Sequence, residues 1–395
     1  MSAWEALYIF IATSNERHYF VMKYKTEPGT AKAHFLILLA AWIFIQAMLL
    51  YQYGIITSNE AVKYAREANN FLNGKGFSEQ KYIFYSVYIF IHIVFIKAGF
   101  ETVGVYIFQL LVNLLSVYFL YKTARKVYQN TGIAFIAALL LIICLPFQYW
   151  TVCLYTESLF CSLIIILLYS LFGTDTNNRI RYAYAALLFL LLLFSRPTGI
   201  FFMAVTAILI FYKFLHERKI TAAVLGILLA ATGFVFFLNY EMNSASSYNF
   251  IKPYLEHYVI CDVPYPGSTP LANIYGSGIR AVVSYARDNT AEFLHLFFLR
   301  LVSFWGITRP FYSGLHNWML RIFFYPLYLA AIISVIKQWK TKQALIIFCL
   351  ATMGAFTISA MLTCDEWSNR FIMPVIPLVI FLAANGIFAM FNKKR

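Results

Sequence analysis

Two carboxylates stand at the ends of long apolar runs, where they could move a proton. Glu60 comes shortly after the apolar run 34–56, and Glu157 directly precedes the run 158–172. A carboxyl group at a water-poor interface can be tuned to act as a general base. Glu60 is therefore a candidate base, although a solvated loop acid would occupy the same place. Glu157 also has a structural interpretation, because the helix dipole stabilises an acid in a first helical turn.

Three basic residues lie at the ends of apolar runs and could bind an anion. Lys81 precedes the apolar segment 82–96, and we expect it to hold a phosphate or to anchor that segment at the headgroups. Arg196 stands in a Ser-Arg-Pro-Thr-Gly turn, where it could bind an anion or extend to lipid headgroups. Arg370 follows Glu366 by four residues, a spacing that also permits an ion pair on one helix.

The elements that must position these residues are membrane helices. The 395 residues are 61% hydrophobic and only 12% charged, which is more apolar surface than a soluble core can use. The apolar runs are long and continuous rather than alternating, so they predict helices and exclude a barrel. We therefore predict an all-α polytopic membrane protein. Runs of spanning length lie at 34–56, 101–121, 131–150, 158–172, 182–195, 198–213, 220–239, 318–336, 343–362 and 371–391.

Charge decides the topology of two further apolar segments, 82–96 and 291–308. If neither crosses the membrane, the inner side holds 18 of the 31 Lys and Arg and 5 of the 17 acids, a net charge of +13. The outer side then carries a net charge of +1, as the positive-inside rule predicts. This gives about ten spans, with both termini cytoplasmic and both segments lying in or dipping into the outer interface.

This topology divides the chain into four parts. We predict an N-terminal cytoplasmic interfacial segment (1–33) and a transmembrane module (34–239) whose first outer loop is 57–100. An outer cap of interfacial helices (240–317) and C-terminal transmembrane helices (318–395) follow.

The cysteines and the missing motifs narrow the chemistry further. Cys261 and Cys364 fall in outer segments, where a bridge between them is one option, and the other four cysteines read as small apolar residues. The chain has no GxxxxGK[ST], GxGxxG or GxSxG motif, no DxD pair, and no HxxxH or HExxH. Nucleotide cofactors and a protein-built metal site are therefore not expected. The basic residues set topology, so nucleic acid is not an expected partner.

The order of these features resembles the GT-C membrane glycosyltransferases, in particular the bacterial aminoarabinose lipid A transferases and the protein O-mannosyltransferases. The first outer loop carries the string Glu60-x-x-x-Tyr64-Ala65 and then Phe71-Leu72-x-Gly74. The end of the chain carries Glu366-x-x-x-Arg370-Phe371-x-x-Pro374-x-x-Pro377. The resemblance covers roughly 34–239 and 364–391. Two positions depart from it: the acid at 60 is Glu where Asp is usual, and Tyr82 replaces a usual proline.

The resemblance implies roles for individual residues. Glu60 would be the catalytic base and Glu157 a second catalytic acid. The donor phosphate would be bound by Lys81, Arg196 and Arg370.

Four further residues would contact the acceptor or hold the catalytic side chains in place, namely Asn59, Tyr64, Tyr85 and Glu366. No metal ligands are assigned, and a divalent cation would at most assist.

The resemblance also implies a reaction and a location. A polyprenyl-phosphate-linked sugar would be transferred, with inversion, to a hydroxyl of a lipid, glycan or protein acceptor at the outer face of a bacterial inner or cell membrane. Two other classes stay open. A transporter or flippase of lipid-linked sugars would share an outer cavity and a basic groove. A polysaccharide polymerase or ligase is expected to work in one large outer loop between late spans, whereas the acids here cluster in the first loop. A transporter is expected to show internal repeats and interrupted spans, and no repeat is seen.

Overall fold

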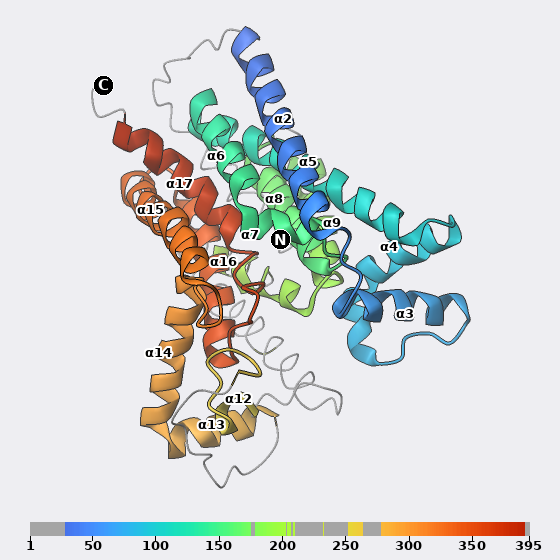
Figure 1. Ribbon diagram of the computed structural model, residues 1–395. Coiled ribbons are helices and arrows are strands. Elements are labelled where there is room, and N and C mark those ends of the chain that lie inside the picture. The colour runs from blue at the N-terminus through green and yellow to red at the C-terminus, as the bar shows by residue number, and fades with distance from the viewer. Residues whose placement is uncertain are drawn as a thin grey trace. The chain divides into compact units, whose positions relative to one another are not determined.

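The computed structural model describes residues 28–174, 178–202, 204–206, 208–209, 232, 252–263 and 278–391. Within these ranges the elements are helices joined by loops, with three isolated β-bridges, which confirms the predicted all-α class (Figure 1). The elements are α2 (Pro28–Tyr53), α3 (Glu60–Leu72), η1 (Gln80–Tyr85), α4 (Ser86–Lys97), α5 (Glu101–Tyr128), α6 (Thr131–Ile143), α7 (Leu145–Gln148), η2 (Tyr149–Thr151), α8 (Thr156–Phe172), α9 (Asn178–Leu193), η3 (Pro197–Ile200), α12 (Lys252–Leu255), α13 (Gly278–Asp288), α14 (Thr290–Gly306), α15 (Gly314–Gln338), α16 (Gln343–Leu362) and α17 (Ile376–Phe391). Most of the predicted N-terminal segment lies outside the described residues.

The chain forms two compact units and passes between them several times. Unit 1 consists of Met1–Ile200, Leu327–Ile346 and Ile376–Arg395. Unit 2 consists of Phe201–Pro326 and Ile347–Val375. The first outer loop and the turn around Glu157 therefore belong to unit 1, whereas the loop that carries Arg370 belongs to unit 2.

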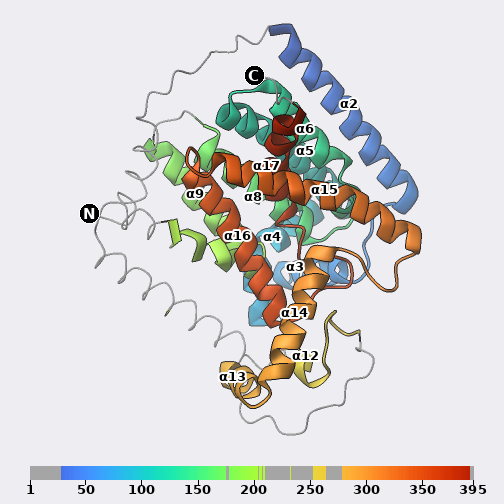
Figure 2. The same cartoon turned by 90° about the vertical axis from the view of Figure 1, so that its left-hand side faces the viewer.

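The core of unit 1 is built around α8. This helix is apolar around nearly its whole circumference, as expected for a helix surrounded by others, and every residue from Thr156 to Ile165 is buried. It packs against α5 on one side and α9 on the other, and α5 also lies along α6 (Figures 1 and 2). The residues at both ends of α8 are thereby fixed in a rigid helical frame.

Helix α17 closes this core and approaches its neighbour closely. A Cβ atom at Gly386 would stand 1.9 Å from the backbone oxygen of Ala330 in α15, so only glycine fits there. One residue earlier, the Asn385 amide donates to the Ser334 hydroxyl at 2.8 Å. Small residues and buried polar side chains are the usual means of joining helices in a membrane.

Fewer spans are recognised among the described residues than the sequence predicts. Four helices are long and apolar enough to cross a membrane, namely α2, α5, α15 and α16, and a bent pair could supply a fifth. Shorter apolar helices, among them α8 and α17, fall below that length. The predicted span 220–239 lies almost wholly outside the described residues and the span 198–213 lies partly outside them, so a total of ten stays a prediction. Helix α4 has 12 residues, or roughly 18 Å, which is too short to cross.

Two predicted spans have different boundaries in the structure. The run 131–150 is not one helix, because α6 ends at Ile143 and the chain bends by 63° before Leu145–Thr151. Pro146 explains the break, since proline lacks the backbone donor and clashes with the preceding turn. The last span begins at Ile376 rather than 371, so Arg370 lies in a turn and shares no helix with Glu366.

Unit 2 is held together by polar contacts around α14. Arg300, fully buried, donates to the backbone oxygens of Tyr258 at 2.8 Å and Pro253 at 2.9 Å and stacks on the Tyr254 ring. The disulfide between Cys261 and Cys364, foreseen as an option, is present and joins two loops of this unit. The other four cysteines are free and buried.

Candidate active site

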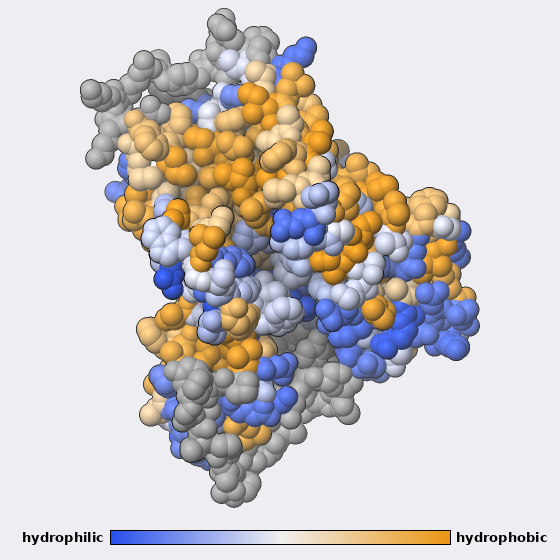
Figure 3. Space-filling view, viewed as in Figure 1, coloured by the Kyte–Doolittle hydropathy of each residue, from blue (hydrophilic) through white to orange (hydrophobic). Residues whose placement is uncertain are grey.

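Glu60 begins α3, the amphipathic helix of the first outer loop. The inner face of α3 buries Ala61, Tyr64 and Ala68, whereas hydrophilic side chains gather on the outer face of this helix (Figure 3). The Glu60 side chain is 27% exposed and pairs with Lys63 at 2.8 Å. The carboxylate is therefore accessible and is held on the helix surface.

The residue before Glu60 has a strained backbone. Asn59 has φ 54° and ψ −113°, a combination that residues with a side chain rarely adopt. Such a conformation costs about 1–3 kcal/mol and occurs preferentially at functional sites. The Tyr155 hydroxyl interacts with the Asn59 side chain and with the Glu60 backbone. Burial raises the pKa of Tyr155, and these two interactions lower it.

The loops that carry Glu60 and Glu157 are joined by backbone hydrogen bonds. Ile56 donates to the Val152 oxygen at 2.8 Å, and Leu154 donates to the Ile56 oxygen at 3.0 Å. Together they form a parallel bridge between Ile56 and Cys153. The sequence placed these two loops on one side of the membrane, and the structure brings them into contact.

Glu157 and Arg196 form a buried ion pair. Arg196 Nη1 lies 2.7 Å from Glu157 Oε1, and the two side chains are only 6% and 2% exposed. The guanidinium also lies over the Phe160 ring. Gly199 makes the Arg196 turn tight, since a Cβ there would stand 2.3 Å from the Leu192 backbone oxygen. Arg196 therefore does not extend to the lipid headgroups.

Lys81 opens the segment before α4 and has an acidic neighbour. Its Nζ lies 2.8 Å from Glu79, and its side chain is 17% exposed. The loop before it is fastened to α3, because the buried Glu67 accepts hydrogen bonds from the Ser78 backbone at 2.8 Å and hydroxyl at 2.5 Å. Tyr64 packs on the loop as well, with its ring 5.6 Å from that of Tyr85. Tyr64 and Tyr85 thus serve as packing contacts between α3 and η1.

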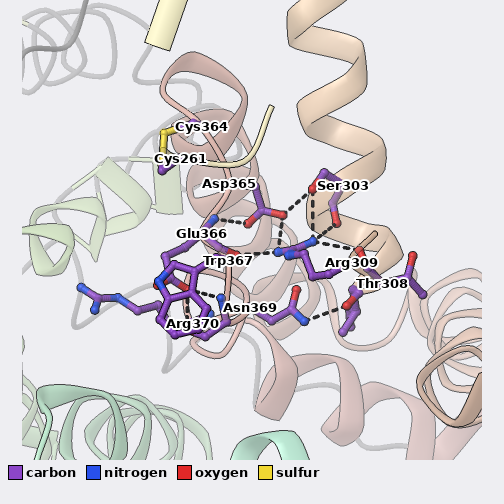
Figure 4. Close-up of polar contacts among 12 residues, drawn as sticks. Cys261, Ser303, Thr308, Arg309, Cys364, Asp365, Glu366, Trp367, Asn369 and Arg370 are labelled. Atoms are coloured by element: carbon purple, nitrogen blue, oxygen red, sulfur yellow. Dashed lines mark hydrogen bonds and ion pairs between the residues drawn. A yellow bond between two sulfur atoms is a disulfide. The ribbon is translucent and has the colours of Figure 1, made fainter. Parts of the chain in front are cut away.

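Arg370 and Glu366 lie in unit 2, in the loop that follows α16. Figure 4 shows the Arg370 guanidinium pointing away from the buried pair of Arg309 and Asp365 beside it. That pair has a distance of 2.7 Å, and Asp365 also accepts from Ser303 at 2.8 Å. The loop that carries Arg370 is thus held from within by an ion pair.

The Glu366 carboxylate caps its own turn. It accepts from the Ser368 backbone at 2.7 Å and from the Ser368 hydroxyl at 2.5 Å. Burial raises the pKa of Glu366, whereas Arg370 and the Ser368 hydrogen bonds lower it.

Sequence reasoning missed the polar residues that hold these loops. Gln109, Glu67, Arg309 and Asp365 are all buried and all make hydrogen bonds or ion pairs within their units. A signal was available for Gln109, because an amide in the middle of an apolar run is costly in a membrane unless it is bonded. In the described part of the chain, no group of three or more His, Cys, Asp or Glu side chains could hold a metal ion. The assisting divalent cation therefore stays a prediction.

A comparison with known protein families matches part of the chain. Residues 85–240 match the family model of dolichyl-phosphate-mannose-protein mannosyltransferases. This match supports a GT-C superfamily glycosyltransferase. Together with the apolar helices, it indicates an integral membrane glycosyltransferase. The matched region includes Glu157 and Arg196, and it begins after Glu60 and Lys81. No curated protein matches the chain.

Proposed function

We propose that this protein transfers a sugar from a polyprenyl-phosphate donor to an acceptor hydroxyl at the outer membrane face, with Glu60 as the general base. The observation that carries the proposal is the contact between the two acid-bearing loops. The Ile56–Cys153 bridge and the Tyr155 interaction bring the loop of the accessible Glu60 next to the loop of Glu157. The strain at Asn59 supports a functional position at this point of the chain.

The proposed reaction is a single displacement. The Glu60 carboxylate takes the proton of the acceptor hydroxyl as its oxygen bonds to the anomeric carbon of the sugar. The bond from that carbon to the phosphate oxygen breaks, and polyprenyl phosphate leaves with the electron pair. Because attack and departure occur on opposite faces, the configuration at the anomeric carbon inverts. A positioned base typically contributes about 10²–10⁴-fold to the rate.

Arg196 is proposed to stabilise the leaving phosphate. The Glu157 carboxylate accepts a hydrogen bond from Nη1, at one edge of the guanidinium. Arg196 Nε is buried and has no hydrogen-bond partner among the described residues, which leaves this donor for a phosphate oxygen. Glu157 then holds the arginine in place, so we assign Glu157 to positioning Arg196. Lys81 is proposed to meet the same phosphate, in exchange for its pair with Glu79.

The placement of unit 2 loops on the outer side is also a proposal. Disulfides persist in oxidising compartments, so the bridge between Cys261 and Cys364 supports an outer position for the loop with Glu366 and Arg370. A role for Arg370 in binding donor phosphate stays a prediction from the sequence.

A transfer assay tests the assignment of Glu60. Membranes that contain the protein are supplied with polyprenyl-phosphate-linked radioactive mannose, and covalent attachment to lipid, glycan and protein fractions is measured separately. Glu60→Gln should lower attachment by about 10²–10⁴-fold without reducing the amount of folded protein. Asp288→Asn, at an exposed acid of α13, is the matched control and should leave attachment unchanged.

Two outcomes reject the proposal. If attachment of the sugar is unchanged in Glu60→Gln, Glu60 is not the general base. If the labelled sugar crosses the membrane without becoming attached, the protein is a transporter. If mannose fails with both wild type and control, the same assay with other polyprenyl-phosphate sugars identifies the donor.

A further inference from the structure

Gln109 lies inside the membrane-spanning helix α5 and makes contact with both halves of the candidate active site. It is fully buried. Its amide nitrogen donates to the Thr151 oxygen at 3.2 Å and to the Cys153 oxygen at 3.0 Å. Its amide oxygen accepts from the hydroxyl of Tyr88 in α4. Both N–H groups and the oxygen of one side chain are thus in use.

The two loops that Gln109 joins are the ones that carry the proposed chemistry. On one side, Tyr88 belongs to α4, which continues directly from η1 and Lys81. On the other side, the three successive backbone carbonyls of residues 151–153, which begin at the last residue of η2, accept hydrogen bonds from two different residues in alternation. Thr151 and Cys153 accept from Gln109, whereas Val152 accepts from Ile56, which leads to Glu60. The segment 151–154 is therefore held between α5 and the Glu60 loop.

We propose that Gln109 is a positioning residue that fixes the loops of Glu60 and Glu157 relative to each other from within the membrane. This inference rests on the proposed function for its catalytic consequence. The hydrogen bonds of Gln109 to Thr151, Cys153 and Tyr88, which we call the clasp, can be tested without a substrate. An amide serves here because it offers two donors and an acceptor without a charge, and a charge is costly at this depth.

Asn113 provides a matched control on the same helix, one turn further along. It is also a buried amide of α5, but its oxygen accepts from the indole of Trp42 in α2 at 2.8 Å. This hydrogen bond joins Asn113 to α2 and to neither active-site loop. Replacing Asn113 therefore removes a comparable buried polar group and leaves the clasp intact.

Cys153 offers a readout that does not depend on activity. Its side chain is buried within the clasped segment. Burial raises the pKa of the Cys153 thiol to about 12, although the hydrogen bond to Tyr149 lowers it, so the closed loop is unreactive. In a background where Cys144, Cys161 and Cys349 are alanine, Cys153 is the one free thiol, because the remaining two cysteines are paired.

The test measures the rate at which N-ethylmaleimide alkylates Cys153 in the full-length protein in membranes. Gln109→Leu should raise this rate roughly 5- to 150-fold, because two buried carbonyls lose their donor and the segment opens more often. Asn113→Leu should change it by less than about twofold. Tyr88→Phe removes only the other side of the clasp, so its alkylation rate should lie below that of Gln109→Leu.

Sugar transfer measured on the same membranes distinguishes the structural role of the clasp from its effect on catalysis. The clasp predicts that Gln109→Leu lowers kcat more than it raises KM, because the base is misplaced while donor binding through Arg196 persists. The clasp is overturned if Gln109→Leu leaves the alkylation rate of Cys153 unchanged, or if Asn113→Leu raises this rate by the same factor. This holds for any result of the transfer assay. A Cys153 loop that opens while transfer is unchanged overturns the catalytic role given to Gln109 and leaves the clasp standing. Wild-type membranes that transfer no sugar overturn the proposed function, and the alkylation rates then still decide the clasp.

Discussion

The buried pair of Glu157 and Arg196 gives the sharpest quantitative prediction. Removing one partner leaves a charge without its counterion in a dry helical core, which costs about 3–5 kcal/mol. The 2.7 Å distance corresponds to an attraction of roughly 6 kcal/mol at an effective dielectric constant of about 20, so a penalty of this size is reasonable after desolvation is subtracted. Arg196→Met alone should therefore destabilise unit 1 strongly.

The double replacement should recover most of the loss. Glu157→Gln with Arg196→Met leaves no buried charge at this position, and apolar or neutral replacements of buried pairs are often nearly neutral. At about 2–4 °C per kcal/mol, the single variants should melt about 6–20 °C below wild type and the double variant close to it.

A double-mutant cycle measures this coupling. Melting of the detergent-solubilised protein is followed by fluorescence-detected size exclusion for the wild type, both single variants and the double variant. If the single effects simply add, with a coupling below about 0.5 kcal/mol, the two side chains do not interact and the geometry described above is wrong. A double variant that is stable but transfers no sugar would place Arg196 on the substrate, as proposed.

Three further predictions concern other parts of the structure. Replacing Cys261 and Cys364 by alanine opens a cross-link that spans 103 residues, which should cost roughly 4–5 kcal/mol and appear as a lower melting temperature that dithiothreitol no longer changes. Burial raises the pKa of Glu366, so the protonated side chain stabilises the fold fully below the usual carboxyl pKa range. This stabilisation is lost as the pH rises through the raised pKa. The melting temperature of the wild type should therefore fall relative to that of Glu366→Gln over this pH interval. Glu67→Ala should release the 73–79 loop and increase tryptic cleavage at the exposed Lys75, as measured by mass spectrometry; equal cleavage in both proteins would contradict the contact.

The sequence predicted the helical class and the grouping of the acid-bearing loops because both depend on local patterns. Long apolar runs predict helices wherever they occur, and charge balance alone placed Glu60 and Glu157 on one side of the membrane. The bend at Cys144 was missed although Pro146 was visible, because the apolar run continues through it.

The partners of individual charges could not be predicted, because they depend on long-range packing. Glu157 and Arg196 are 39 residues apart and Arg309 and Asp365 are 56 apart, and no local spacing reveals either pair. By contrast, the spacing of Glu366 and Arg370 permits an ion pair only on a shared helix, and the helix here begins only at Ile376. Local periodicity thus predicted elements, whereas tertiary contacts decided which charges meet.

The closure of unit 1 by α17 has a consequence for biosynthesis. Helix α17 packs against α5, α6 and α8, and all three of these helices precede it along the chain. Before α17 is made, the backbone oxygen of Ala330 has no Gly386 to pack against. The contacts that close unit 1 therefore cannot form until Ile376–Phe391 has been synthesised. The candidate active-site residues Glu60 and Glu157 are thus synthesised well before the helix that completes their unit.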